Sequence, residues 1–257
     1  MIQSTVDFIK SIQQDLAKWK QGVHPWFRGE SGPELVLCPR IAKYTALQEN
    51  HFVQSFRRKA GGLANTPPRS ETDLWLFLAQ HYGVPTRLLD WTEGALLALY
   101  FAINQRRPNP RVYMLNPHRL NELAVKAKSD YLNYPLSWGE KKPGYENIAL
   151  AWNLRNPEGG VQLPIAIPAT YQDHRMIAQR SCFTVHGTSL EPIPNILRNE
   201  GVDLGECLIE YRVDAGRIDR LMQELSVLGI TAATIFPNLD SLAKDMIEEL
   251  GNPQQGG

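Results

Sequence analysis

The chain has 257 residues, a length that favours one elaborated domain over two. Its 27 basic and 27 acidic residues give a formal net charge of zero, which argues against general attraction to nucleic acids or membranes. The three cysteines are far apart and form no zinc-binding pair, and their odd number favours a reducing cytoplasm. No apolar run reaches the roughly 20 residues of a membrane span, so we expect a cytoplasmic protein with no membrane partner.

The first half of the chain mixes helical and strand patterns. Helical spacing of apolar residues predicts helices over 5–21, 45–60, 72–82 and 91–105, the last of them apolar on every side and therefore buried all round. Gly22 and Gly83 supply two of the helix ends. Strand composition predicts strands at 26–30 and 111–115, and a strand or extended turn at 34–41.

The second half begins with the least legible stretch, 117–160, which we interpret as a lid, an insertion, a partner surface or part of the core. Beyond it we expect strands at 163–169, 182–187, 207–213 and 230–236, and helices over 215–228 and 239–250. This mixture favours an α+β fold, with mixed small sheets and surrounding helices. We divide the chain into an N-terminal helix (1–22), one domain (23–250) and a flexible tail (251–257).

The densest polar cluster, QHYGVPTRLLDWT at 80–92, overlaps the start of the most apolar predicted helix. Its plain interpretation is structural: Asp90 would cap this helix, His81 would lie at the negative end of the preceding one, and Arg87 would pair with Asp90. The cluster nevertheless holds more polar side chains than two helix ends need. Polar groups backed by a rigid apolar helix are typical of a pocket wall, so the pattern also predicts a ligand pocket.

Two weaker clusters lie elsewhere. In WFRGE, Arg28 can offer its planar fork to phosphate or carboxylate while Gly29 lets the backbone approach, although a surface arginine at a turn would give the same pattern. In the stretch 173–187, solvated positions are the plainer interpretation of its polar residues, His174, Arg175, Gln179 and His186.

Several common site motifs are missing from the sequence. Neither GxGxxG nor GxxxxGK[ST] occurs, so no Rossmann or P-loop nucleotide site is indicated. HExxH and GxSxG are absent as well. No spacing of cysteines, histidines and acids suits a metal, and we expect no metal site.

A set of motifs occurs in a fixed order along the chain: Phe27-Arg28-Gly29, Pro39-Arg40, AQHYGVPTRLLDWT at 79–92, ALYFA at 98–102, Gln179 before FTVH at 183–186, Gly229-Ile230 and FPNLD at 236–240. In this combination the chain resembles the FRG domain family, named for a Phe/Tyr-Arg-Gly motif. The resemblance runs from about residue 20 to 250, so the domain over 23–250 would be a single FRG domain. It implies a bacterial or phage protein, with some members in defence or toxin contexts.

A weaker resemblance connects the chain to ADP-ribosyltransferases. That fold often opens with an aromatic-Arg-Gly strand whose arginine holds a phosphate of NAD, a part that Arg28 would play here. It later has a glutamate-bearing loop that leads into a strand of the form F-x-V. This chain has Gln179 in that loop, with Asp173 as the nearest acid upstream. Glutamine keeps a hydrogen bond but loses the charge that stabilises the transition state, unless Asp90 or Glu210 supplies it.

The leading hypothesis is a pocket that binds NAD, another nucleotide or a nucleic-acid end, with ADP-ribosyl transfer or NAD glycohydrolysis as its reaction. The candidate catalytic residues are Arg28, His81, Asp90 and Gln179. Arg28 and Arg87 would bind phosphates, His81 and Asp90 would transfer protons or contact ribose, and Trp91 or Tyr82 would stack on a base. The candidate ligand-binding residues are Gly29, Gln80, Tyr82, Thr86, Arg87 and Trp91.

Two alternatives remain. The same pocket could sense a nucleotide or hold a protein partner without turnover, which the amide of Gln179 favours. A nuclease would use His81 and Asp90; because carboxylates are not clustered, it would work without two metals and would need a second group such as His174 or His186.

Overall fold

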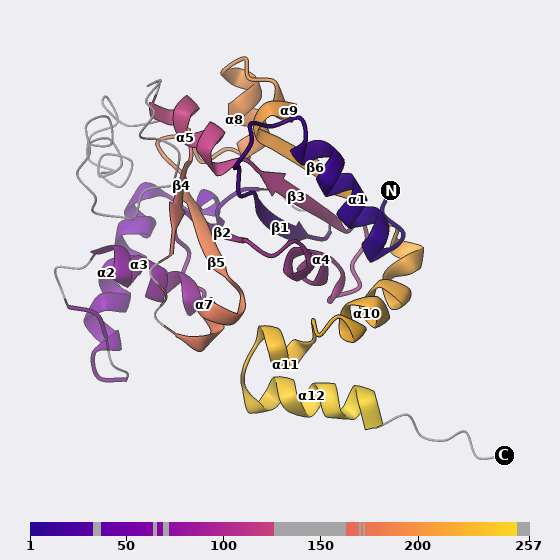
Figure 1. Ribbon diagram of the computed structural model, residues 1–257. Helices are drawn as coiled ribbons and strands as arrows, with labels where there is room; N and C mark the ends of the chain where they lie inside the picture. The colour runs from indigo at the N-terminus through magenta and orange to yellow at the C-terminus, as the bar shows by residue number, and fades with distance from the viewer. Residues whose placement is uncertain are drawn as a thin grey trace.

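The computed structural model of the protein describes residues 1–32, 37–63, 66–68, 72–125, 163–169, 171 and 173–250. In this part of the chain, helices surround one six-stranded sheet, which confirms the α+β class (Figure 1). The strands form this single sheet in place of the several small sheets that we expected. None of the helices in the same ranges has the length and hydrophobicity needed to cross a bilayer.

The sheet has the strand order β4-β5-β2-β1-β3-β6, and all neighbouring strands are antiparallel. The strands are β1 (Trp26–Glu30), β2 (Leu88–Thr92), β3 (Arg111–Leu115), β4 (Ile165–Pro168), β5 (Ser181–Val185) and β6 (Leu208–Arg212). β1 pairs with β3 along its whole length, and β2 does so with β5. In contrast, β1 and β2 are in register only where Phe27 faces Thr92. The sheet therefore opens between β1 and β2, near its centre.

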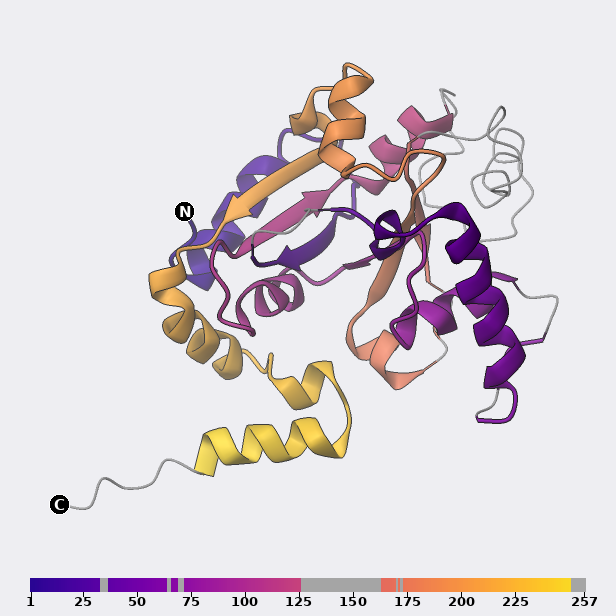
Figure 2. The same cartoon turned by 180° about the vertical axis from the view of Figure 1, so that it is seen from behind.

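The helices cover the sheet and its ends. They are α1 (Thr5–Leu16), η1 (Arg40–Lys43), α2 (Ala46–Ala60), α3 (Thr72–His81), α4 (Ala95–Ile103), α5 (Pro117–Val125), α7 (His174–Ala178), α8 (Ile193–Asn199), α9 (Leu204–Cys207), η3 (Ala215–Arg217), α10 (Ile218–Val227), α11 (Ala232–Ile235) and α12 (Leu239–Leu250). α11 and α12 lie at the end of the molecule opposite α5, α8 and α9 (Figures 1 and 2).

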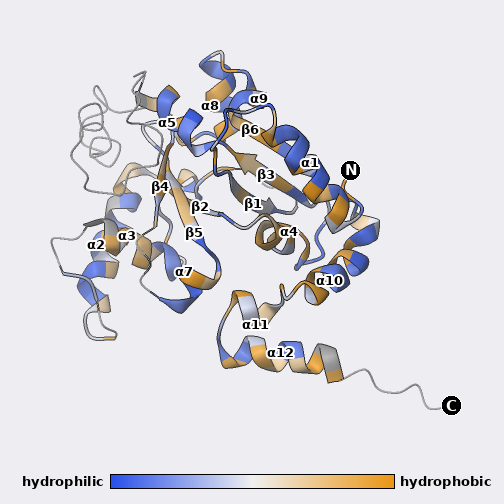
Figure 3. Ribbon diagram, viewed as in Figure 1, coloured by the Kyte–Doolittle hydropathy of each residue, from blue (hydrophilic) through white to orange (hydrophobic). Residues whose placement is uncertain are grey.

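Helix α4 packs on the middle of the sheet, against β1. It is apolar along its whole length (Figure 3), and six of its nine residues are buried. On β1, Phe27 belongs to the apolar cluster that includes α4, whereas Trp26 belongs to a second cluster together with residues of α3, α5 and β5. The side chains of β1 thus alternate between two cores, and the next position, Arg28, follows Trp26 in the alternation.

Most predicted elements are confirmed to within about two residues, but the start of the apolar helix is wrong. The predicted helix over 91–105 begins at Ala95, and residues 88–92 form β2. Gly94, not Asp90, is its N-cap residue. The stretch LLDWT is held in the sheet because β5 pairs with it at all five positions. Tertiary pairing thus overrides the local helical pattern.

The predicted strand at 230–236 is also wrong, because Ala232–Ile235 form the short helix α11. Thr231 and Thr234 cap the helix reciprocally, and the carboxylate of Asp245 accepts hydrogen bonds from the backbone N–H groups of Ala232 and Ala233. These contacts satisfy the free N–H donors at the N-terminus of the helix. The β-branched composition of the segment predicts a strand and gives no sign of these caps.

Other boundaries differ as well. The first helix ends at Leu16, five residues before the predicted end at 21. Of the predicted strand at 34–41, residues 33–36 lie outside the described ranges, and the rest leads through Leu37, at φ 55°, into η1. The stretch 117–160 begins with α5, while its remainder and the tail at 251–257 lie outside the described residues.

Candidate functional site

A pocket of about 630 Å³ lies where the sheet opens between β1 and β2. Its walls come from β1, η1, α3, β2, α4, α7 and β5, and from Phe236 directly after α11. All four candidate catalytic residues line this pocket, although they are spread over about 150 positions of the sequence: Arg28, His81, Asp90 and Gln179. Three of the candidate ligand-binding residues line it as well: Gly29, Gln80 and Trp91.

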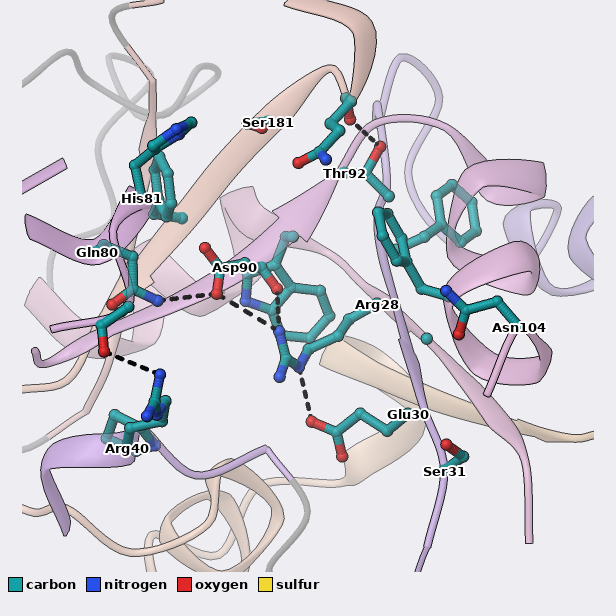
Figure 4. Close-up of a pocket in the computed structure, with 18 of the residues that line it drawn as sticks. Arg28, Glu30, Ser31, Arg40, Gln80, His81, Asp90, Thr92, Asn104 and Ser181 are labelled. Carbon is teal, nitrogen blue, oxygen red and sulfur yellow. Dashed lines mark hydrogen bonds and ion pairs between the residues drawn. The ribbon is translucent and has the colours of Figure 1, made fainter. Parts of the chain in front are cut away.

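Arg28 lies near the centre of the pocket (Figure 4). Its Nε atom is 2.6 Å from a carboxylate oxygen of Glu30, and its Nη1 atom donates a hydrogen bond of 2.7 Å to the backbone carbonyl of Asp90. In a continuous ladder, a β1 amide would bond this carbonyl. Because the strands separate there, the guanidinium takes that place. Arg28 therefore bridges the opening of the sheet.

Gly29, the next residue of the motif, faces α4. A Cβ atom at this position would lie 1.9 Å from the carbonyl oxygen of Ala98 and 2.5 Å from the amide nitrogen of Ala102. No side chain fits between β1 and α4 at this distance. The glycine lets the helix approach the strand, and this packing fixes the strand that carries Arg28.

Asp90 is held from the side of α3. Thr86 donates a 2.7 Å hydrogen bond to the amide oxygen of Gln80, and the Gln80 amide nitrogen donates one of 2.8 Å to the Asp90 carboxylate. The same carboxylate lies 4.0 Å from the Arg28 guanidinium, and its side chain is 57% exposed. These hydrogen bonds position a solvated carboxylate beside the central arginine, and Figure 4 shows the last of them, from Gln80 to Asp90.

His81, the last residue of α3, pairs with Asp173 across the pocket wall. The Nδ1 atom of its ring lies 3.2 Å from one carboxylate oxygen of Asp173. The other oxygen accepts a 2.8 Å hydrogen bond from the backbone N–H of Met176 and so caps α7. The cap fixes the carboxylate, and the carboxylate in turn restrains the ring of His81.

Gln179 ends α7, two residues before β5 begins. Its backbone carbonyl accepts a 2.7 Å hydrogen bond from the Thr92 hydroxyl, and its amide nitrogen is 3.4 Å from the carbonyl of Ile235. These contacts join the loop before β5 both to the end of β2 and to α11. Gln179 lines the pocket together with Thr92, which it contacts.

Three of the candidate ligand-binding residues lie outside the pocket. Tyr82 is 64% exposed and packs near Phe56. Thr86 is buried and reaches the pocket only through Gln80. Arg87 is buried away from the pocket, where it pairs with Glu49 at 2.6 Å and donates to the carbonyl of Gly187.

The environment of Arg87 explains its burial. Desolvation raises the pKa of Glu49, while the hydrogen bond from Arg87 opposes that shift. The buried pair of Arg87 and Glu49 is therefore structural, and the Arg87 guanidinium is not available to bind a ligand. Trp91 does line the pocket, but its ring is 3% exposed and its Nε1 atom donates to Thr184. Neither Tyr82 nor Trp91 presents an open face to the pocket for stacking.

The charges around the pocket are unequal. Six basic side chains face two carboxylates, those of Glu30 and Asp90. The basic residues are Arg28, Arg40, Lys43, Arg107, Arg111 and Arg175. Arg40 bonds the carbonyl of Gly83 at 2.9 Å and lies on the same side as Gln80 (Figure 4). In a concave site with low-dielectric walls, such an excess of positive charge favours anionic ligands.

Sequence reasoning missed part of this wall. Arg40 belongs to the Pro39-Arg40 motif, so a signal for it was present, but nothing in the local sequence marked Arg107, Arg111 or Arg175 as neighbours of Arg28. The aromatic residues Phe101 and Phe236 also line the pocket, as does Asn104. These residues meet only because the α4–β3 loop and the end of α11 come together in the fold.

Other residues considered from the sequence lie elsewhere. Glu210, on β6, bonds the Tyr113 hydroxyl at 3.0 Å and does not line the pocket. His186 is fully buried, and His174 is exposed outside the pocket. In the part of the chain that is described, no group of three or more histidines, cysteines or acids is arranged to hold a metal ion.

Comparison with known proteins gives one match. Residues 24–111, about a third of the chain, match the family model of the FRG domain. The matched range holds Arg28, Arg40, His81 and Asp90, whereas Gln179 and Phe236 lie outside it. Neither a curated protein nor a solved structure matches the chain.

Proposed function

This chain carries an FRG domain, and we propose that the pocket around its Arg28 binds a nucleotide of the NAD class. The proposal rests on one observation. One basic cavity is lined by all four candidate catalytic residues, Arg28, His81, Asp90 and Gln179. Ligand pockets commonly have volumes of roughly 300–1,000 Å³, and the cavity of about 630 Å³ falls within this range. The six basic residues suit a ligand with two phosphates.

Arg28 and Arg40 are the proposed phosphate ligands. Both lie on the wall formed by β1 and η1, and an arginine binds phosphate through two parallel hydrogen bonds. Arg28 is already paired with Glu30, so a phosphate would take over part of that interaction. A cation without a partner is costly in a partly buried site. This exchange avoids the cost, because the guanidinium is paired both with and without the ligand.

Asp90 and Gln179 are the proposed ribose contacts. Cleavage of NAD between nicotinamide and ribose builds positive charge on the sugar, and a nearby carboxylate stabilises that charge. Gln179 provides a hydrogen bond without charge, and the exposed carboxylate of Asp90 provides the charge from the neighbouring strand. His81, held by Asp173, is the proposed acceptor for the proton of the attacking hydroxyl.

The weaker resemblance to ADP-ribosyltransferases supports the same reading. It requires the aromatic-Arg-Gly strand and the loop before a later strand to face one site. Here β1 and β5 both flank β2, and Arg28 and Gln179 both line the pocket. Transfer to water would release ADP-ribose and nicotinamide. In the cytoplasm such NAD consumption would stop growth, which is the effect of a toxin or defence protein.

A second candidate function is nucleotide sensing without turnover. Two observations favour it: the loop before β5 carries the amide of Gln179 rather than an acid, and Arg28 is held by Glu30 and by the carbonyl of Asp90. A nuclease has less support, because neither His174 nor His186 lines the pocket to act beside His81.

Incubation of the purified protein with NAD, followed by chromatography of the products, tests the proposal. Release of nicotinamide that is lost in Asp90→Asn establishes turnover; the asparagine can still accept the Gln80 hydrogen bond. Asp219→Asn is the control, because Asp219 forms only an exposed pair with Arg106. Binding of NAD without products assigns the protein as a sensor. Absence of both binding and products refutes the nucleotide pocket.

A further inference from the structure

The pocket has an aromatic corner, which we define as Phe101, Asn104 and Phe236. Phe101 and Asn104 lie at the end of α4, and Phe236 directly follows α11. The rings of Phe101 and Phe236 meet edge to face, with centroids 5.9 Å apart. Both rings are only partly buried, so each keeps apolar surface that another group can cover.

The polar member of the corner has an unused acceptor. The Oδ1 atom of Asn104 is buried and has no hydrogen-bond partner among the described residues. The Asn104 amide points from the end of α4 into the pocket (Figure 4). Buried polar atoms in folded proteins nearly always have a partner, so an orphan acceptor in a pocket wall calls for a donor from a ligand.

The Phe236 ring also contacts a cation. The Arg175 guanidinium lies 5.1 Å from the centre of the Phe236 ring. The amide of Gln179 reaches the carbonyl of Ile235, directly before Phe236. These contacts tie the phenyl ring to α7, so it is held in the pocket wall by residues from a distant part of the chain.

From these contacts we propose that the aromatic corner is a subsite for a flat heteroaromatic ring that carries an N–H donor. The ring would cover the apolar surface of the two phenylalanines, and its donor would bond Asn104 Oδ1. Adenine, through its amino group, and nicotinamide, through its carboxamide, share this chemistry. The inference deepens the proposed function and rests on it for the identity of the whole ligand.

The subsite is tested first with rings that carry no phosphate. Saturation-transfer NMR with nicotinamide and with adenosine should show transfer to the ring protons of at least one of them. The signal should fall strongly in Phe236→Leu and in Asn104→Leu. Phe56→Leu is the matched control, because Phe56 packs near Trp75 and Tyr82 and does not line the pocket. Transfer to one ring only identifies which part of a dinucleotide occupies the corner.

Titration calorimetry then compares NAD with ribose 5-phosphate, which has no ring. NAD affinity should fall roughly tenfold in Phe236→Leu, while ribose 5-phosphate affinity stays unchanged. The inference is overturned if neither ring binds the wild-type protein, or if NAD binds both variants as tightly as the wild type. In the second case the proposed nucleotide function still holds. Ring binding without any NAD binding would instead overturn the function and retain the subsite.

Discussion

Gly29 lies so close to α4 that a Cβ atom on it would be 1.9 Å from the carbonyl oxygen of Ala98. The two motif residues Arg28 and Gly29 therefore have separate tasks. The glycine allows a helix to pack on the strand, and the arginine spans the opening between β1 and β2. A substitution at each position should consequently affect a different property.

Gly29→Ala should lower the free energy of unfolding by about 3 kcal/mol, because the backbone of α4 must move away from β1. Urea denaturation measures the change. Gly61→Ala is the control, since a Cβ atom there meets nothing within 4 Å and the residue has φ −60°. Equal effects of the two substitutions would contradict the close packing of α4 on β1.

Glu30→Gln should tighten binding of a phosphate-bearing ligand by about tenfold, because it removes the carboxylate that competes for the Arg28 guanidinium. Titration calorimetry with ADP-ribose at low and high salt measures the effect, which should shrink as salt rises. Asp7→Asn, on the exposed surface of α1, should leave the affinity unchanged. Weaker or unaltered binding in Glu30→Gln would show that Arg28 does not exchange Glu30 for the ligand.

Asp173 combines a helix cap with the pairing of His81, and two substitutions separate these roles. Asp173→Asn keeps a side-chain acceptor for the Met176 amide, so the free energy of unfolding should stay within about 0.5 kcal/mol of the wild type. Asp173→Ala should lower it by about 1 kcal/mol. If His81 accepts a proton during turnover, both should slow NAD cleavage roughly tenfold or more. Full activity of Asp173→Asn would restrict Asp173 to its capping role.

His186 should make stability depend on pH. Desolvation lowers the pKa of His186 from 6.5 to about 3; a hydrogen bond with the backbone of Glu191 opposes this shift, and the nearby Arg87 adds to it. Between these values the unfolded chain binds a proton that the folded chain does not. The free energy of unfolding is therefore not reduced by His186 above about pH 6.5. Below that pH it falls as pH falls, by up to about 1.4 kcal/mol per pH unit.

His186→Leu isolates this contribution. The His186 ring is fully buried, and among the described residues the only polar contact that bears on it besides Arg87 is with the backbone of Glu191, so the leucine should leave stability at pH 7.5 equal or higher. The difference in unfolding free energy between wild type and variant, measured by urea denaturation at pH 7.5, 6 and 5, should change with pH. A constant difference over this range would mean that His186 titrates alike in both states.

The sequence predicts the fold class, most elements and the centre of the pocket. Strand composition places β1, and helical spacing of apolar residues places α3, because in both the local pattern agrees with the packing in the fold. The strand β2 escapes prediction because LLDWT continues directly into an apolar helix, and only pairing with β5 makes it extended. The helix α11 escapes because Asp245, 13 and 12 residues beyond the two amides that it bonds, supplies the acceptor at its N-terminus.

The pocket residues show the same division. Arg28, His81, Asp90 and Gln179 all belong to the motifs that carry the family resemblance, so the sequence marks each of them. Arg87 has the same local signal as these residues, but Glu49 of α2 draws it into a buried pair. Phe236 begins the FPNLD motif, but neither it nor Asn104 is marked locally as a pocket residue, because only the meeting of α11 with α4 places them together.

The most direct test of the central claim is the change in melting temperature on adding NAD or ADP-ribose, compared in wild type, Arg28→Gln and Arg198→Gln. Arg198 is an exposed residue of α8, outside the pocket. Binding to the folded state raises the melting temperature, so the wild type and Arg198→Gln should shift equally and Arg28→Gln should not shift. An equal shift in all three proteins, or no shift in the folded wild type, would contradict a nucleotide pocket built on Arg28.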